Sequence, residues 1–244
     1  MELLTSSWLE IEEYLKKLDG IIIPIGSIEQ HGPIGLIGTD MLCVDVIAKK
    51  FGEKTNTLIA PTIGYSPAEF NMDFPGTISI SPKLFEDLCC EVITSFIRHG
   101  FKHVYILNGH GANLEPLNRV TCSFENIQIR IKSWWDFTAV NELRKLYYGD
   151  WEGMHATPSE ISITQVANRI IDPSLAKIPP KKLSKKYIKD HSGDKHGNAK
   201  DHKNSFPDGR VGSHSALASR EHGLNLIKTV VSEVQKDYLE FLKT

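Results

Sequence analysis

Four short runs of strand character alternate along the chain with segments of helical character. The first, residues 21–25, is continuous and apolar, as is typical of a strand buried on both faces of a sheet. The other runs cover residues 57–63, 102–107 and 127–133. Helices are predicted at residues 7–18, 40–51 and 81–99, from about residue 113, and at residues 159–168 and 219–242. This alternation predicts an α/β fold, a single-domain sandwich in which helices flank a mostly parallel β-sheet.

Length and composition are those of one ordinary globular domain over residues 1–244. The net charge of −2 gives no electrostatic support for binding nucleic acid or an anionic membrane. No apolar run is long enough to span a membrane, and the acidic, amphipathic N-terminus does not resemble a signal peptide, so we expect a cytoplasmic protein. The four cysteines form no C-x-x-C pair and are expected to be reduced and mostly buried.

Residues 177–208 depart from the core pattern, since they are rich in Lys, Pro, Gly and His. The apolar pattern resumes after them, so they are interpreted as a long surface excursion and not as a linker between domains. The spacing of His191, His196 and His202 matches no closed set of metal ligands, and lysines surround them. We therefore expect these histidines to lie in a solvated loop.

The first apolar run leads into a glycine-rich loop that carries Glu29, His31 and Asp40. Open parallel sheets form their sites at the carboxyl ends of the strands, where this loop is placed. Carboxylate and imidazole are suitable ligands for divalent ions, and the Glu-x-His spacing directs both side chains to one side of an extended loop. The alternative is structural: Asp40 caps a helix, Glu29 lies on the surface and His31 is an ordinary loop histidine.

Two further segments add polar groups of the same kind. The sequence NGHGAN places His110 between glycines directly after the third run, where it binds a ligand or simply packs in a tight turn. The sequence HATPSE places His155 before a proline and Glu160 in a first helical turn, where a Glu can also just favour the helix dipole. Together the segments supply enough ligands for two divalent ions that share one carboxylate, with zinc, manganese and iron(II) equally suited.

The sequences GSIEQHGPIGLIGTD, FPGTISI, NGHGAN and HATPSE occur in this order, and the chain resembles the creatininase (creatinine amidohydrolase) family over about residues 6–240. The resemblance implies a compact α/β sandwich, two divalent metal ions per chain and a homo-oligomer, by resemblance a hexamer. Asp40 would bridge the two ions. The metal ligands that it implies are Glu29, His31, Asp40, His110 and Glu160.

The resemblance also implies roles for neighbouring residues. His155 corresponds to a histidine that supports the ligands or faces the substrate, and Trp151 and Glu152 fall near a substrate-side Trp-Asp pair of creatininase. This chain has Ala112 where creatininase has a metal-binding Glu, which argues against creatinine as the substrate. Glu160 is then expected to help hold the second metal.

The predicted reaction is hydrolysis of a non-peptide C–N bond in a small amide, cyclic amide or formamide. Hydroxide from a metal-activated water would attack the carbonyl, and His155 would donate a proton to the departing nitrogen or hold the carbonyl oxygen. Glu160 would act as a ligand, a base or both. In residues 62–75, Glu69 and Asn71 are candidate substrate contacts, unless that loop is merely packed. A peptidase-like maturation enzyme for a small modified peptide and a non-enzymatic metal-binding protein are the alternatives.

Overall fold

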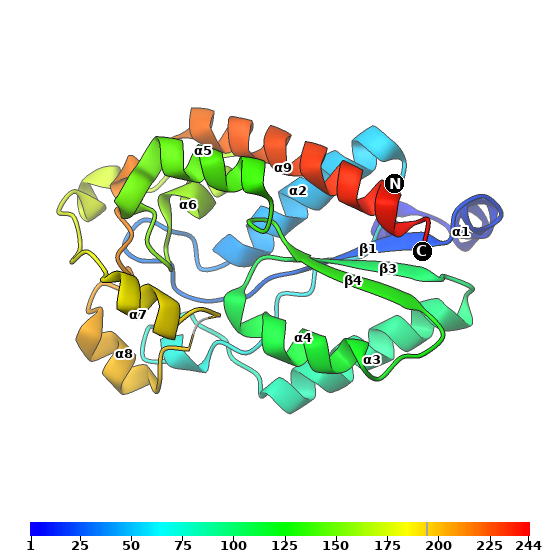
Figure 1. Cartoon of the computed structure of the whole chain (residues 1–244), viewed down its shortest axis with the longest axis horizontal. Helices are drawn as coiled ribbons and strands as arrows, with labels where there is room; N and C mark the ends of the chain where they lie inside the picture. The colour runs from blue at the N-terminus through cyan, green and yellow to red at the C-terminus, as the bar shows by residue number, and fades with distance from the viewer. Residues whose placement is uncertain (194) are drawn as a thin grey trace.

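A four-stranded parallel sheet lies at the centre of the computed structural model, which describes residues 1–193 and 195–244 (Figure 1). Its order is β2-β1-β3-β4, and the bounds are β1 Gly20–Ile25, β2 Leu58–Ile59, β3 His103–Asn108 and β4 Gln128–Ser133. The expected α/β class with a parallel sheet is confirmed. The run at residues 57–63 forms only the two-residue β2, because Pro61 has no N–H to donate to the ladder, and pairing returns only as an isolated bridge between Ile25 and Ile63.

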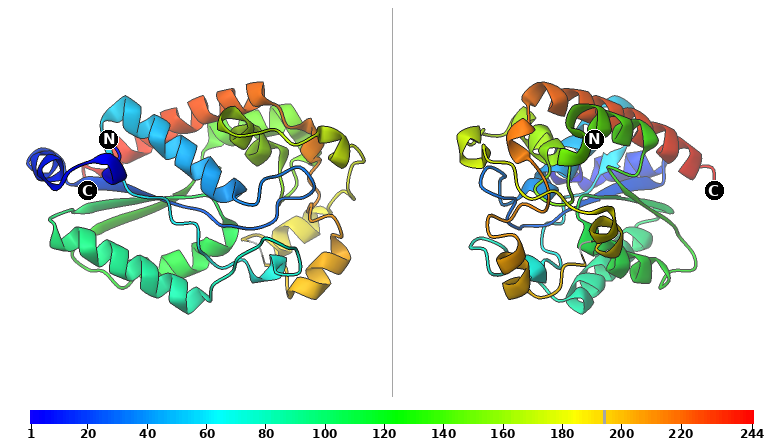
Figure 2. Two further views of the ribbon diagram at one scale, coloured as in Figure 1. Left: turned by 180° about the vertical axis from the view of Figure 1, so that it is seen from behind. Right: turned by 60° about the vertical axis from the view of Figure 1, so that its left-hand side comes forward.

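Helices cover both faces of the sheet, as Figures 1 and 2 show. Because side chains alternate along β1, Ile22 packs into a core on one face of the sheet, and Ile21 and Ile23 pack into a second core on the other face. The first core belongs to α2 Thr39–Thr55, α5 Thr138–Tyr148, α6 Pro158–Ala167 and α9 Arg220–Phe241. The second belongs to α1 Trp8–Leu15, α3 Pro82–Arg98 and α4 Leu114–Thr121.

Short elements complete the chain. The single-turn 3₁₀ helices are Leu3–Thr5, Glu69–Asn71, Gly111–Asn113, Gly149–Trp151, Pro173–Ala176 and Ser215–Leu217. All four cysteines are free, with Cys43 and Cys89 buried, Cys90 partly buried and Cys122 exposed. In the described part of the chain, no helix combines the length and the apolar character needed to cross a membrane.

The excursion at residues 177–208 carries two short helices, α7 Lys185–Asp190 and α8 Ala199–Ser205. They lie at the end of the sheet opposite the chain termini (Figure 1). His196 and His202 are buried there, with ring centroids 5.0 and 5.1 Å from that of Phe70. The expectation of a solvated loop is therefore wrong for these two histidines, because aromatic packing against Phe70 removes them from water.

Two glycines allow the start of α2 to lie directly against the ends of β1 and β3. A Cβ added to Gly26 would lie 2.4 Å from the backbone nitrogen of Met41, and one added to Gly109 would lie 2.7 Å from the carbonyl oxygen of Asp40. No other residue type permits such close approach of backbone to backbone. These contacts bring Asp40 to the carboxyl edge of the sheet.

Gly26→Ala is expected to lower the free energy of unfolding by about 1–3 kcal/mol. The added methyl group would clash with backbone atoms of α2, and these atoms can move away only if the whole start of the helix shifts. Denaturant unfolding would measure the change. Gly38→Ala is the matched control, because a Cβ there meets only the Leu42 side chain at 3.8 Å and φ is −91°. Equal stability of the two variants would contradict the proposed tight contact.

Candidate metal centre

Five candidate ligands lie at the carboxyl edge of the sheet. Glu29 and His31 follow β1, and His110 follows β3. Asp40 lies in the first turn of α2 and Glu160 in the first turn of α6. All five side chains are buried, and the most exposed residue, Glu160, is only 8% accessible. The chain therefore concentrates its buried polar groups at the edge where open parallel sheets form their sites.

Asp40 lies at the middle of this group. Its Oδ1 lies 3.0 Å from Nε2 of His31, and its Oδ2 lies 3.0 Å from Nδ1 of His110. Ser27 donates a hydrogen bond of 2.8 Å to Oδ2. Asp40 belongs to two sets whose ligand atoms lie within 4.8 Å of one another, Glu29 with Asp40 and His110, and His31 with Asp40 and Glu160. A carboxylate shared by two such sets has the position of a bridging ligand.

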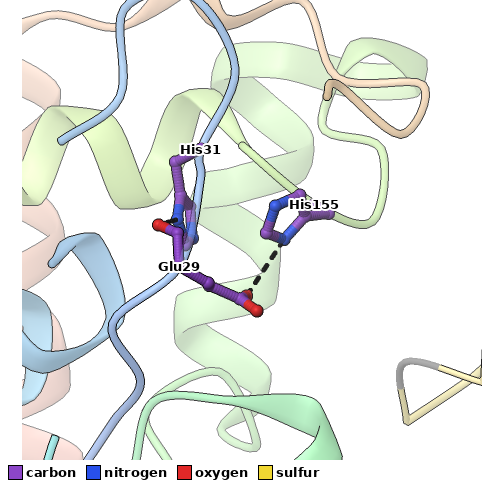
Figure 3. A group of neighbouring side chains, drawn as sticks. All are labelled: Glu29, His31 and His155. Carbon is purple, nitrogen blue, oxygen red and sulfur yellow. Dashed lines mark hydrogen bonds and ion pairs between the residues drawn. The ribbon is translucent and has the colours of Figure 1, made fainter. Parts of the chain in front are cut away.

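His155 forms a third set with Glu29 and His31 (Figure 3). Its Nδ1 lies 3.5 Å from Oε1 of Glu29, and its ring centroid lies 4.4 Å from that of His31. Its Nε2 lies 2.7 Å from the backbone carbonyl oxygen of Gln30, which can only accept a hydrogen bond. We therefore assign a proton to Nε2, which leaves Nδ1 facing the carboxylate of Glu29.

Opposite charges inside the group control its protonation. Burial alone would lower the pKa of His31, but Asp40 raises that pKa to about 10. Burial also acts to lower the pKa of His110, and Glu29 and Asp40 together hold it well above its usual value. Burial would raise the pKa of Asp40, yet both imidazoles keep it well below its usual range. Burial raises the pKa of Glu29 and takes that of Glu160 to about 7. Strongly perturbed groups in one buried cluster are typical of functional sites.

Glu160 combines the two interpretations that the sequence leaves open. Its Oε2 accepts a hydrogen bond of 2.8 Å from the backbone N–H of Thr157, and the Thr157 hydroxyl accepts from the N–H of Glu160. This is a capping box at the start of α6. The same carboxylate lies in the set with His31 and Asp40, so the cap fixes the orientation of a candidate ligand.

Asn71 lies behind the candidate ligands. It is fully buried, donates a hydrogen bond of 3.1 Å to Oε2 of Glu29 and accepts one of 2.8 Å from Nε2 of Gln30. Gln30 is itself held by the carbonyl oxygen of Gly209 at 3.0 Å. Asn71 therefore lies where it can orient the Glu29 carboxylate, and its expected contact with a substrate stays a prediction.

Asn71→Ala is expected to weaken metal binding by about 10- to 100-fold, because the Glu29 carboxylate loses the partner that orients it. Competition with a chromogenic chelator would measure the affinity. Asn126→Ala, which changes an exposed loop residue, should bind metal like the unmodified protein. Unchanged metal affinity with slower turnover in Asn71→Ala would instead return Asn71 to the substrate-contact role.

A cavity of about 330 Å³ opens beside the candidate ligands. Its lining includes Asp40, His110, His155, Glu160, Trp135, Arg144, Met154 and Ile188. Trp135 and Arg144 come from residues 134–148, where the sequence pattern predicts no helix or strand. The α7 residue Ile188 shows that the excursion contributes to the wall.

None of the four expected substrate contacts, Trp151, Glu152, Glu69 and Asn71, is among the described residues that line this cavity. The Trp151 ring centroid lies 5.7 Å from that of His214, and Lys182 covers the indole. Glu152 pairs with Arg144 at 2.9 Å. Glu69 lines a neighbouring groove of about 710 Å³.

The profile of the creatininase family, described as creatinine amidohydrolase, matches residues 5–237. This chain belongs to the creatininase family. As a member of that family, it shares its fold with the solved structure named "Creatininase Mn", at a TM-score of 0.78 and 20% identity, over 100% of this chain and 99% of the other.

Curated relatives match this creatininase-family chain over shorter regions. The 3-dehydro-scyllo-inosose hydrolase of Thermotoga maritima is 38% identical over 109 residues, which are 44% of this chain and 35% of the relative. The mycofactocin precursor peptide peptidase of Mycolicibacterium smegmatis is 33% identical over 103 residues, which are 40% of this chain and 41% of the relative. These matches span well under half of each relative's length.

Proposed function

We propose that this chain is a metal-dependent hydrolase that acts on the C–N bond of a small amide, cyclic amide or formamide. The observation that carries the proposal is the buried Asp40 carboxylate, shared between two sets of candidate ligands. In this proposal Glu29, Asp40 and His110 hold one divalent ion, and His31, Asp40 and Glu160 hold a second. Membership of the creatininase family supports a hydrolytic role.

The donor atoms fit such ions. They are carboxylate oxygens and imidazole nitrogens, which suit zinc, manganese and iron(II). Oε1 of Glu29 is buried and accepts no well-formed hydrogen bond from the described residues. It lies 3.3 Å from Nδ1 of His110 and 3.5 Å from Nδ1 of His155. A cation is the natural partner of an oxygen placed in this way.

Bound divalent ions supply a Lewis acid that polarises a carbonyl and lowers the pKa of water. The proton transfers that accompany hydrolysis are assigned to His155 and Glu160. His155 keeps its Nε2 proton on the Gln30 carbonyl and directs Nδ1 to the centre, where Nδ1 can take up a proton from the attacking water and pass it to the departing nitrogen. Glu160, whose pKa burial raises to about 7, is proposed as both ligand and proton acceptor.

A peptidase for a small modified peptide is the second candidate. The groove of about 710 Å³ that Glu69 lines has Gly111, Leu114, Ser192 and Gly193 in common with the cavity. An extended chain lying in this groove would place one bond in the cavity. The partial match to a peptidase supports this candidate as well.

The test combines metal analysis with a substrate panel. Protein purified without chelator or affinity-tag metal should carry about two divalent ions per chain by elemental analysis. It should then hydrolyse small amides, cyclic amides or formamides, whereas turnover of short peptides alone would select the peptidase. Bound metal without any hydrolysis would favour a non-enzymatic metal-binding protein. A chain that stays metal-free after zinc, manganese or iron(II) is added would overturn the proposal.

We propose in addition, from the family resemblance, that the protein is a cytoplasmic homo-oligomer, a hexamer. Light scattering on the purified protein would give the mass of the assembly. A mass close to that of the 27.4 kDa chain would overturn the oligomer.

A further inference from the structure

One guanidinium lines the cavity of about 330 Å³ beside the candidate metal ligands. Arg144 of α5 is the one Lys or Arg side chain among the described lining residues. The volume is at the lower end of that of small-molecule sites, so a single small molecule fills it. A substrate that reaches Asp40 or Glu160 within this cavity therefore also meets Arg144.

The Arg144 side chain is held in a fixed orientation. Its Nε donates to Oε1 of Glu152 at 2.9 Å, and its Nη1 donates to Oδ1 of Asn141 at 2.7 Å. Its guanidinium carbon lies 5.4 Å from the centre of the Trp134 ring. Within residues 1–193 and 195–244, Nη2 donates no hydrogen bond. A guanidinium held in this way loses little conformational entropy when it binds a ligand.

A chain of contacts also links Arg144 to the candidate ligand Glu160. The Glu152 carboxylate that pairs with Arg144 accepts a hydrogen bond from the Ser159 hydroxyl. That hydroxyl lies 3.0 Å from the hydroxyl of Thr157, whose backbone N–H donates to Glu160. The position of the guanidinium is therefore fixed relative to the proposed metal ions. Glu152, expected from the sequence to contact the substrate, becomes a positioning residue for Arg144.

We propose that Arg144 binds a carboxylate of the substrate, which is then a small amide or formamide that also carries a carboxylate group. The proposal rests on the metal-dependent hydrolase function above. Glu152 already balances part of the guanidinium charge, and the remaining donors suit a monoanion with two oxygens. A phosphate dianion would need further cations, and the described lining residues offer no other Lys or Arg.

The test compares two matched probes by calorimetry on the metal-loaded protein. Succinic monohydroxamate and butyrohydroxamate both present a metal-binding hydroxamate, and they differ at the far end, a carboxylate in the first and a methyl group in the second. Because charge-assisted hydrogen bonds are strong, the carboxylate probe should bind about 10-fold tighter or more. Arg144→Met should remove this preference and leave butyrohydroxamate binding unchanged, while Arg144→Lys should keep only part of it.

Arg130→Met is the matched control. Arg130 of β4 also pairs with a carboxylate, Asp237 at 3.3 Å, and lies over an aromatic ring, Phe241 at 4.9 Å, but it does not line the cavity. This variant should keep the full preference for the carboxylate probe.

The possible failures can be told apart. Equal binding of the two probes to the unmodified protein would overturn the role of Arg144 and leave the metal centre intact. Tighter binding of the phosphonate analogue, 3-phosphonopropionohydroxamate, would overturn the carboxylate assignment. Failure of all three probes to bind the metal-loaded protein would overturn the proposal that this cavity is the substrate site of the metal centre, and the inference with it, whereas a protein that takes up no metal would overturn the proposed hydrolase function.

Discussion

Asp40→Asn is expected to abolish binding of both metal ions and to lower hydrolytic activity by about 1,000-fold or more. Asp40 is the residue common to both ligand sets, and the neutral amide cannot bridge two cations. Losing several kcal/mol of Lewis-acid stabilisation of the transition state corresponds to a rate loss of this size. Elemental analysis and turnover, measured on the same preparation, would check both parts of the prediction.

Asp45→Asn is the control for this variant, since it makes the same chemical change in the same helix. Asp45 pairs with Lys49 at 2.9 Å and accepts from the Thr62 hydroxyl at 2.8 Å, outside the candidate centre. It should keep metal and activity. If Asp40→Asn still bound two ions, Asp40 would not be the bridge, and the pairing of the other ligands would need to be reassigned.

His155→Ala is expected to keep its metal ions and to lose about 100- to 10,000-fold in turnover, the usual range for removing a general acid or base. The side chain is proposed to move a proton through Nδ1, whereas both proposed ion sites draw their ligands from other residues. This variant should therefore lose turnover while its metal content stays unchanged.

The structure offers His103→Ala as the control, since this histidine pairs with a carboxylate, Asp19 at 2.8 Å, at the amino end of β3. Its turnover should stay near that of the unmodified protein. Loss of an ion from His155→Ala would make His155 a ligand, as its set with Glu29 and His31 would permit. Turnover at the unmodified rate would remove His155 from the reaction.

Much of the fold could be predicted because its elements carry strong local patterns. The strands β1, β3 and β4 lie in the runs of strand character at residues 21–25, 102–107 and 127–133, and Ser7 and Ser81 cap the starts of α1 and α3, the helices predicted at residues 7–18 and 81–99. The residues of the candidate centre could be found for a topological reason. They follow strands or begin helices, and a parallel sheet gathers those positions at one edge.

The remaining features depend on contacts between residues far apart in the chain. The helix α5 has the buried positions Val140 and Tyr148, but Phe137, the residue before its start, makes no side-chain cap, so no capping residue in the sequence marks where the helix begins. The packing of His196 and His202 on Phe70 joins segments more than 120 residues apart. No local sequence pattern predicts contacts between such distant segments. For the same reason, no motif marks Arg144 as a site residue, and only its place in the cavity does so.

At the proposed centre, the close pairing of Asp40 with two histidines would make metal uptake an exchange of metal ions for protons. Although burial opposes it, the neighbouring carboxylates raise the pKa of His31 to about 10 and hold that of His110 well above its usual value, yet an imidazole must be neutral to bind a metal. Each ion that enters must therefore displace protons from ring nitrogens that face Asp40. Zinc added to metal-free protein should lower the pH of a weakly buffered solution. A lower pH should in turn protonate the two histidines and release the metal. The acidity of the surroundings, as well as the supply of metal, would then set the fraction of the protein that carries metal.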